Sequence, residues 1–311
     1  MNLPLVQSFF AETSLRRVNL RVFFQVEHNL VLPGGRGLRE SDPVGTVTSM
    51  FDRHEKYRVR VWDKPLYFSS DVVIEPTMQN VENIRRSNAL PESVMKRIVY
   101  APSIPWAYEA GGDRPLQVIT NFGREDEPRR AEIMERLREV CPSYANIQGI
   151  YGLDAIRDLY SSTRIIVNVH QTEHHHSIEE FRVLPALSRG CIVVSEDVPL
   201  REVIPYGEHI LWCSYDEISD LVAEVDSNYE AYFETIHGPR SELGPLFDEM
   251  RNDFRRSLSA ILSDRSNFTT VARAKRRMHG LAQAINSRTT AFKPLMPLRR
   301  RRAGRTMLRN R

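Results

Sequence analysis

The sequence predicts an α/β protein whose second half folds around a parallel, doubly wound sheet. From residue 115 onward, short apolar segments alternate regularly with amphipathic ones. One segment, RIIVNVH at residues 164–170, is almost continuously apolar, which is typical of a strand buried on both faces. The composition, with 41% hydrophobic and 27% charged residues, is that of a globular protein. These observations favour a folded α/β chain over a disordered one.

The elements of the second half follow from this alternation. Strands are expected at residues 116–122, 145–152, 164–170, 191–196 and 209–213, with helices at 127–140, 153–162, 183–190 and 215–225. The first of these helices carries Ile133, Leu137 and Val140 on one face, which should pack on the sheet. Because such sheets bind ligands at the carboxyl ends of their strands, the loops that follow the strands are the expected site.

The first half of the chain indicates a smaller α/β domain. Strand-like runs are expected at residues 19–28, 57–62, 71–76 and 96–104, with a helix at 77–88. Three prolines and a Gly-Gly pair within residues 101–115 predict a linker, and GGRG at 34–37 a flexible loop. The expected units are therefore residues 1–112, a smaller α/β domain; 113–240, a ligand-binding domain; 241–288, further helices; and 289–311, a disordered tail.

The tail differs from the body in charge. Residues 289–311 carry eight basic residues and no acidic one, whereas the whole chain has a net charge of +3, so the remainder is net negative. Arginine runs of this kind bind phosphate polyanions and anionic lipid surfaces. We therefore expect residues 293–311 to offer a contact to a polyanion or an anionic membrane surface, and to tether the protein rather than define its activity.

Cysteine usage and hydropathy predict a cytoplasmic protein, with peripheral membrane association through the tail as an open alternative. Cys141, Cys191 and Cys213 are scattered and odd in number, which indicates apolar fillers in a reducing compartment. No apolar run approaches the roughly 18 residues of a membrane span. The first twenty residues lack the basic-then-apolar order of a signal peptide.

Four consecutive segments of the second half carry a family resemblance. They are ITNFGREDEPRR at 119–130, NIQGIYGLDAIRDLYSSTRIIVNVH at 146–170, FRVLPALSRGCIVVSE at 181–196, and REVIPYGEHILWCSYDEISDLVAEV at 201–225. In this order and spacing they resemble the carboxyl-terminal, nucleotide-sugar-binding domain of the group-1 glycosyltransferases, which have the GT-B fold. The resemblance covers roughly residues 115–226, under half of the chain.

This resemblance implies two Rossmann-like domains that face a cleft, the amino-terminal one reduced. It implies transfer of a sugar from a nucleotide-sugar donor to an unidentified glycan, lipid or protein acceptor, with no metal and no other cofactor. Cationic side chains and helix N-termini then hold the diphosphate. The residues that the family motifs place in the donor site are Gly123, Arg124, Arg129, Arg130, Gly152 and Arg182, the last of which would also assist catalysis by facing the diphosphate.

The sequence departs from the family at two positions. The family commonly carries two glutamates eight residues apart, and this chain has Ser177 and Pro185 there. The second glutamate bonds the ribose of the donor, which proline cannot do, so that contact is missing or has moved to Glu179 or Glu180. Pro185 suits the first turn of a helix. A binding protein that kept the fold and lost the chemistry therefore stays open as an alternative to the enzyme.

Four histidines, His170, His174, His175 and His176, follow the most apolar strand. A metal site is not favoured, because three adjacent side chains cannot all point one way and no HExxH motif is present. Polar loop filling and donor recognition remain, since imidazole bonds sugar hydroxyls and diphosphate oxygens. We expect His174 to take part in catalysis and His170 to bind the donor.

Glu27 and His28 close the first expected strand. A carboxylate at a strand end that faces a cleft is suited to act as the base for an acceptor hydroxyl, so Glu27 is the candidate catalytic base. The alternative is a polar pair that only terminates the strand at a turn.

Overall fold

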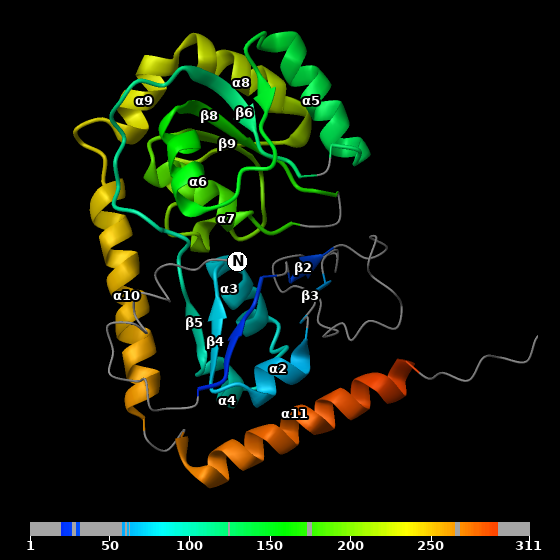
Figure 1. Ribbon diagram of the computed structural model, residues 1–311. Helices are drawn as coiled ribbons and strands as arrows, with labels where there is room; N and C mark the ends of the chain where they lie inside the picture. Colours follow the sequence, from blue (N-terminus) through cyan, green and yellow to red (C-terminus); the bar gives the residue numbers. More distant parts are fainter. Residues whose placement is uncertain are drawn as a thin grey trace, which may run out of the picture.

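The computed structural model describes residues 20–26, 29–31, 58–59, 61, 63–123, 125–172, 176–264 and 268–291. The expected α/β class is confirmed, since the described chain forms two parallel sheets and one short antiparallel pair. The larger sheet and its helices occupy the upper part of Figure 1, and the smaller sheet the lower part. The extended chain between β5 and β6, where we expected a linker, connects them.

The larger sheet has the strand order β10-β9-β8-β6-β7, and every neighbouring pair is parallel. Its strands are β6 (Leu116–Thr120), β7 (Ala145–Asn146), β8 (Thr163–Asn168), β9 (Ile192–Glu196) and β10 (Leu211–Cys213). The strand expected at 145–152 is only two residues long. Gly149 and Gly152, with φ of 72° and 96°, turn the chain out of the extended conformation there.

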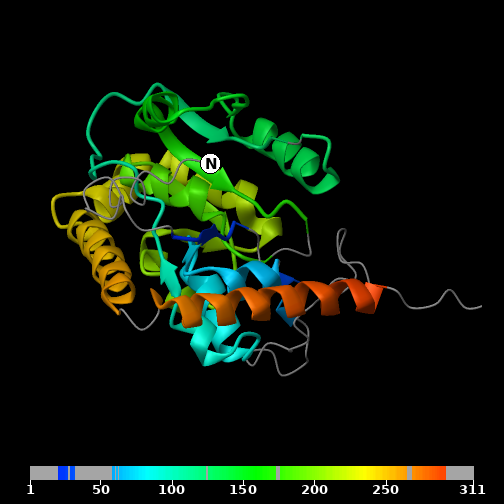
Figure 2. The same ribbon diagram turned by 60° about the horizontal axis from the view of Figure 1, so that its bottom comes forward.

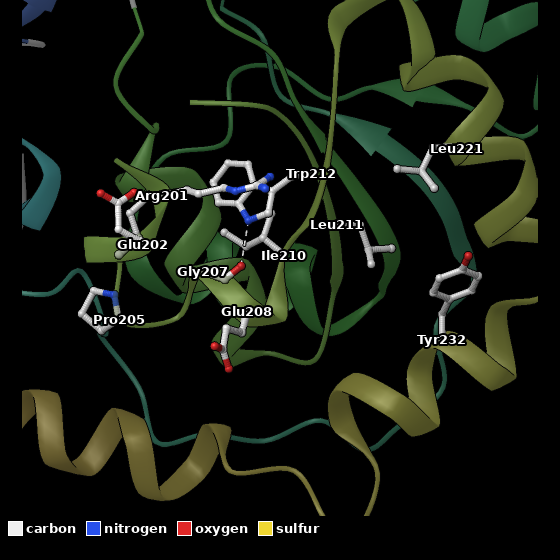
Figure 3. Close-up of a pocket in the computed structure, with 11 residues that line it drawn as sticks. Arg201, Glu202, Pro205, Gly207, Glu208, Ile210, Leu211, Trp212, Leu221 and Tyr232 are labelled. Carbon is white, nitrogen blue, oxygen red and sulfur yellow. Dashed lines mark hydrogen bonds between the residues drawn. The ribbon is translucent and has the colours of Figure 1, made fainter. Parts of the chain in front are cut away.

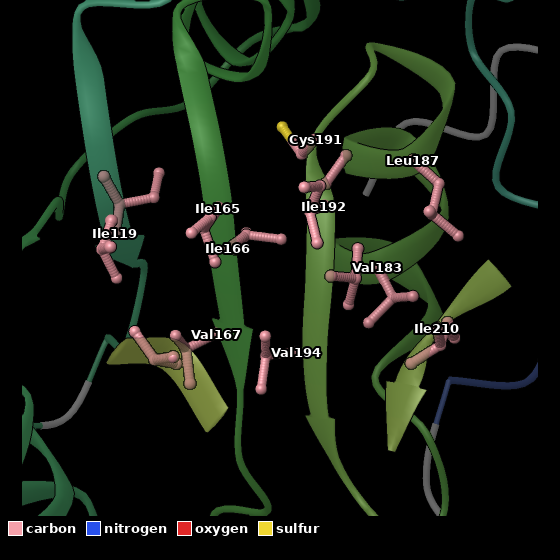
Figure 4. Close-up of a cluster of buried hydrophobic side chains, with 14 of the residues drawn as sticks. Ile119, Ile165, Ile166, Val167, Val183, Leu187, Cys191, Ile192, Val194 and Ile210 are labelled. Carbon is pink, nitrogen blue, oxygen red and sulfur yellow. The ribbon is translucent and has the colours of Figure 1, made fainter. Parts of the chain in front are cut away.

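Helices cover both faces of this sheet. They are α5 (Pro128–Val140), α6 (Leu153–Ser161), α7 (Glu180–Ser188) and α8 (Ile218–Ser227), with short 3-10 turns at Arg201–Val203, Gly207–His209 and Tyr215–Glu217. Since α5 packs on α8 and α6 on α7, the sheet is doubly wound as expected. Figure 4 shows Val183 and Leu187 of α7 lying beside Ile192 and Val194 of β9 in the shared core.

One expected core residue of α5 is wrong. Ile133 and Leu137 are buried as predicted, but Val140 is 38% exposed, and Met134 is buried instead. Val140 is the last residue of α5, where the helix ends. The buried face of the helix is formed by the turns before it.

The smaller sheet has the order β1-β4-β5 and is also parallel. Its elements are β1 (Val22–Phe24), α2 (Lys64–Ser69), β4 (Val72–Glu75), α3 (Met78–Arg86), α4 (Glu92–Met95) and β5 (Ile98–Tyr100). The antiparallel pair is β2 (Leu30–Val31) with β3 (Arg58–Val59). Helix α3 lies where the sequence predicted it, whereas α2 was not expected.

The last three helices are α9 (Tyr229–His237), α10 (Leu243–Ser263) and α11 (Thr270–Ala291). Helix α10 runs down one side of the molecule to the smaller sheet (Figure 1), where Phe254 and Leu258 are buried with Val72, Ile74 and Val99. Residues far along the sequence thus complete the amino-terminal core. Helix α11 packs on α2 and continues past residue 289, where we expected the folded chain to end. None of the described helices combines the length and apolar character needed to cross a bilayer.

Candidate functional site

The strand order of the larger sheet reverses between β6 and β8, and the loops that follow these two strands are called the crevice below. The chain passes from β6 to β7 on one side and then returns to place β8 on the other side of β6. At such a reversal of strand order, the loops at the carboxyl ends of the two strands separate and leave room for a ligand. The loops in question start at Asn121, after β6, and at Val169, after β8.

Three of the arginines predicted for the donor site lie near this crevice. Phe122, fully buried directly after β6, lies beneath two of them: the guanidinium carbon of Arg130 is 4.6 Å from the centre of its ring, and that of Arg182 is 5.4 Å away. The aromatic face attracts both cations. Two residues that are 52 positions apart in the sequence therefore share one platform.

Arg182 is oriented by strand β8. Its Nη1 donates to Oδ1 of Asn168, the last residue of β8, at 2.8 Å. The Asn168 amide in turn donates to Ser195 Oγ of β9 at 3.0 Å. The Nε of Arg182 is buried and has no hydrogen-bond partner among the described residues. A half-buried guanidinium with donor capacity to spare is suited to an anionic ligand.

Arg129 is held in an ion pair. Both of its Nη atoms bond the carboxylate of Glu196 at the end of β9, one of them at 2.6 Å, and its guanidinium carbon lies 3.9 Å from the centre of the Tyr215 ring. Burial raises the pKa of Glu196, but the bond from Arg129 and the neighbouring His170 outweigh it, so the pKa lies below the usual value. The guanidinium of Arg129, which was predicted to bind the donor, is therefore paired with a carboxylate in this structure.

His170 is buried at the same edge. Its backbone N–H donates to Glu196 at 3.1 Å, its Nε2 lies 3.2 Å from the carbonyl oxygen of Asp197, and its ring centre lies 5.4 Å from that of His176. It thus links the end of β8 to the end of β9. Among the described residues, no three side chains of the metal-binding types gather closely enough to hold a metal ion.

The remaining predicted residues fall into two groups. Gly123 and Gly152 are both exposed, and Gly152 precedes the first residue of α6. Arg124, His174 and Glu27 lie outside the residues that the structure describes, so their predicted roles stay predictions.

Pro185 does not lie in the first turn of its helix, as we had expected. Helix α7 begins at Glu180, so Pro185 is an interior residue. Because proline has no N–H, it cannot donate to the carbonyl of Phe181 one turn earlier. Its own carbonyl accepts a bond from Ser188 Oγ at 2.8 Å. The apolar run of the sequence suggested a later helix start, because it did not include the polar first turn.

Glu180, one of the two expected ribose ligands, contacts the smaller sheet through its carboxylate. Its two carboxylate oxygens accept bonds from Tyr100 of β5 at 2.9 Å and from Tyr206 at 3.0 Å. Burial raises its pKa to about 8. Both oxygens of Glu180 are thus engaged, and Glu179, the other expected ribose ligand, is half-buried just before α7.

This burial predicts a pH-dependent stability. The pKa of Glu180 is about 8 in the folded protein and lower when unfolded, so the folded state binds the proton more tightly. The free energy of unfolding should therefore fall as pH rises from about 4.3 toward 8, by about 1.4 kcal/mol per unit from this group. Glu180→Gln, which mimics the protonated form, should melt close to the wild type at about pH 4, where the carboxyl is protonated in both states, and higher than it at pH 8.

Glu75 is also fully buried, and burial raises its pKa. Its ionisation therefore adds to the fall in the free energy of unfolding with rising pH. The difference between Glu180→Gln and wild type isolates the part that belongs to Glu180. Glu139→Gln, at an exposed position on α5, serves as control and should follow the wild type at both pH values. An equal melting temperature of wild type and Glu180→Gln at pH 8 would show that Glu180 is ionised without cost.

A group of polar contacts that the sequence did not reveal links helix α3 to the segment from His176 to Ile178. The side-chain amide of Gln79 in α3 donates to the carbonyl of His176 at 3.1 Å and accepts from the backbone N–H of Ile178 at 2.9 Å. Its neighbour Asn80 bonds Glu75 at 3.0 Å and Ser177 at 3.2 Å. Helix α3 therefore joins the amino-terminal half to the crevice. The sequence feature that could have predicted these contacts is the group of amide side chains, Gln79, Asn80 and Asn83, in an otherwise amphipathic helix.

A separate cavity of about 660 Å³ lies beside β10 (Figure 3). Arg201, Glu202, Leu221 and Tyr232 are among its lining residues, and Trp212 donates from its indole nitrogen to the carbonyl of Gly207 at 2.7 Å. None of the residues that line it belongs to the predicted donor site.

Comparisons with known proteins add little to this description. No family model matches the sequence. Over 120 residues the chain is 29% identical to "Uncharacterized protein R358" of Acanthamoeba polyphaga mimivirus, a match that covers 37% of this chain and 41% of that protein. A solved structure described as "Crystal Structure of TarM" is similar with a TM-score of 0.37 and 11% identity, over 78% of this chain and 48% of that one. The chain spans less than half the length of either relative within these matches. The established description is thus a mixed α/β protein with parallel, Rossmann-like sheets.

Proposed function

We propose that this protein is a glycosyltransferase of the GT-B type that moves a sugar from a nucleotide-sugar donor to an acceptor. The observation that carries the proposal is the pair of arginines on Phe122, at the reversal of strand order in a doubly wound sheet. The motif resemblance of residues 115–226 to group-1 glycosyltransferases supports the same assignment.

In this proposal the arginines supply the positive charge that the leaving diphosphate requires. As the bond between the sugar carbon and the diphosphate oxygen breaks, negative charge develops on the diphosphate, and preorganised cations stabilise it. Arg182 and Arg130 act on that charge directly, while Arg129 positions the edge through Glu196. The exposed N-terminus of α6 at Gly152 adds backbone N–H groups. No metal is required for this step.

The remaining roles follow the sequence. Glu179 is the proposed ribose ligand, and Gly123 and Arg124 are assigned to contacts with the phosphates. His170, two residues after the end of β8, and His174, outside the described residues, are assigned to donor recognition, and His174 is also assigned to catalysis. Glu27 is assigned to removal of the proton from the acceptor hydroxyl as its oxygen forms the new bond to the sugar.

A second candidate is a protein that binds a nucleotide sugar or nucleoside diphosphate and does not turn it over. Two observations favour it. Pro185 occupies the position of the family's ribose-binding glutamate, and the carboxylate of Glu180 is engaged by two tyrosines. Both candidates use the same arginines and differ only in turnover.

A binding panel tests the site and a product assay separates the two candidates. Among the common nucleoside diphosphates and nucleotide sugars, at least one should raise the melting temperature, because a ligand at 100 times its dissociation constant adds about 2.7 kcal/mol to the free energy of unfolding. The shift should persist in EDTA. Release of nucleoside diphosphate from the sugar form supports the enzyme, and binding without release supports the second candidate. If no nucleotide binds, both are wrong.

A further inference from the structure

The solvent-facing side of helix α11 carries an apolar stripe. Val271, Met278, Leu281 and Ile285 are 78%, 64%, 55% and 53% exposed. Their spacings of seven, three and four residues place them on one line along a helix of 3.6 residues per turn. Large apolar side chains rarely stay in water as a continuous row, so the stripe indicates a contact that the described residues do not make.

The opposite side of α11 fixes the orientation of the stripe. Gly280 is buried against α2, where a β-carbon on it would come within 2.7 Å of Ser69 Cβ and 3.0 Å of the Pro65 carbonyl oxygen. Arg276 bonds Asp71, and Arg273 lies 3.9 Å from the same carboxylate. The helix therefore cannot roll to bury its stripe. Figure 2 shows α11 lying across the face of the molecule that comes forward in that view.

The charges of α11 indicate which kind of surface would cover the apolar stripe. The helix has no acidic residue. At about 100° per residue, the exposed Lys275 and Arg277 lie on opposite flanks of the stripe. A second copy of the helix would bring these like charges together, which disfavours self-pairing. An anionic surface satisfies both flanks, because the long side chains reach outward to phosphate groups while the stripe enters the apolar layer.

We propose that α11 is a membrane-surface helix, which lies in the interface of an anionic phospholipid bilayer with Val271, Met278, Leu281 and Ile285 inserted between the lipids. Its 22 residues span about 33 Å, so the contact runs along the membrane rather than through it. The sequence beyond Ala291, with Lys293 and seven arginines and no acid, adds charge of the same sign. This inference is independent of the proposed transfer activity.

Vesicle flotation with the full chain tests the proposal. The wild type should float with phosphatidylcholine vesicles that contain 30% phosphatidylserine and stay below with phosphatidylcholine alone. The double variant Met278→Ser, Leu281→Ser keeps every charge and should bind at least tenfold more weakly. Lys275→Gln, Arg277→Gln keeps the stripe and should lose about thirtyfold, at about 1 kcal/mol per basic residue.

Two control variants remove equivalent groups elsewhere. Val140→Ser deletes an exposed apolar side chain on α5, and Arg85→Gln, Lys96→Gln removes two exposed cations from the amino-terminal half. Both should bind vesicles as the wild type does. As a direct probe, Met278→Trp should be quenched by brominated lipids, whereas Val140→Trp should not.

Three results would overturn the proposal. If the double serine variant floats as well as the wild type, binding comes from charge alone and the stripe has no part in it. If the wild type ignores anionic vesicles and is a dimer that the serine variant dissociates, a second copy covers the stripe. Preference for nucleic acid over anionic vesicles at equal salt would place the basic flanks on a different polyanion.

Discussion

Replacing Arg182 by alanine is expected to reduce donor turnover about a hundredfold. Under the proposed function, this side chain contacts the departing diphosphate, and a comparable donor removed from a preorganised site costs about 2–4 kcal/mol in the transition state. Folding should change little, because the described hydrogen bond from the Arg182 side chain, to Asn168, is between half-buried and buried groups and contributes about 1 kcal/mol. Initial rates of nucleoside diphosphate release, measured with the donor found in the binding panel, give the comparison.

Arg157→Ala is the matched control. Arg157 lies on α6 of the same domain and pairs only with Asp154 and Asp158 among the described residues, so its loss should leave turnover unchanged. Arg182→Lys should recover part of the activity, since it keeps the charge and loses the planar, bidentate geometry. Equal turnover of wild type and Arg182→Ala would restrict Arg182 to orienting Asn168 and would remove it from the site.

Phe254→Ala is expected to lower the free energy of unfolding by about 3–5 kcal/mol. Phe254 is 1% exposed, and its ring lies between α10 and the smaller sheet, with Val72, Ile74 and Val99 around it. Alanine would leave a cavity between α10 and the smaller sheet, two elements that are far apart in the sequence. Denaturant unfolding measured by circular dichroism gives the change.

Val140→Ala controls for the loss of apolar atoms. This side chain is 38% exposed, so its truncation should stay within about 0.5 kcal/mol of wild type. If Phe254→Ala matches Val140→Ala, α10 is not seated on the smaller sheet as the structure shows. If Phe254→Ala unfolds in a separate early transition, the two halves of the protein are only weakly coupled.

The local hydrophobic pattern was sufficient to predict the elements in which that pattern is clear. The strand β8 follows a continuous apolar run, and α5 and α3 have clear helical periodicity, so each lies close to its predicted range. The pattern failed where backbone conformation decides. The positive φ of Gly149 and Gly152 shortened β7, and neither value is encoded in hydrophobic alternation.

The candidate site divides in the same way. The approach of Arg130 and Arg182 to one ring follows from parallel topology, because carboxyl ends of neighbouring strands meet at one edge of the sheet. The hydrogen-bond and ion-pair partners of the site residues could not be predicted from the topology. Glu196 was one acid at the end of a strand, and only the three-dimensional structure places it on Arg129. Glu180 was one of two candidates for a ribose contact, and the structure places its carboxylate on two tyrosines that come from distant segments.

The return of α10 to the amino-terminal sheet sets the order of events during synthesis. Val72, Ile74, Val99 and Ala101 are all synthesised at least about 150 residues before Phe254 and Leu258, which cover them. At a synthesis rate of 5–20 residues per second, this apolar face of the sheet stays uncovered for about 8–30 s before α10 is made. Over that interval, the nascent chain presents the kind of surface that chaperones bind. A chain stopped at residue 240 would keep that surface for good and should be recovered in aggregates.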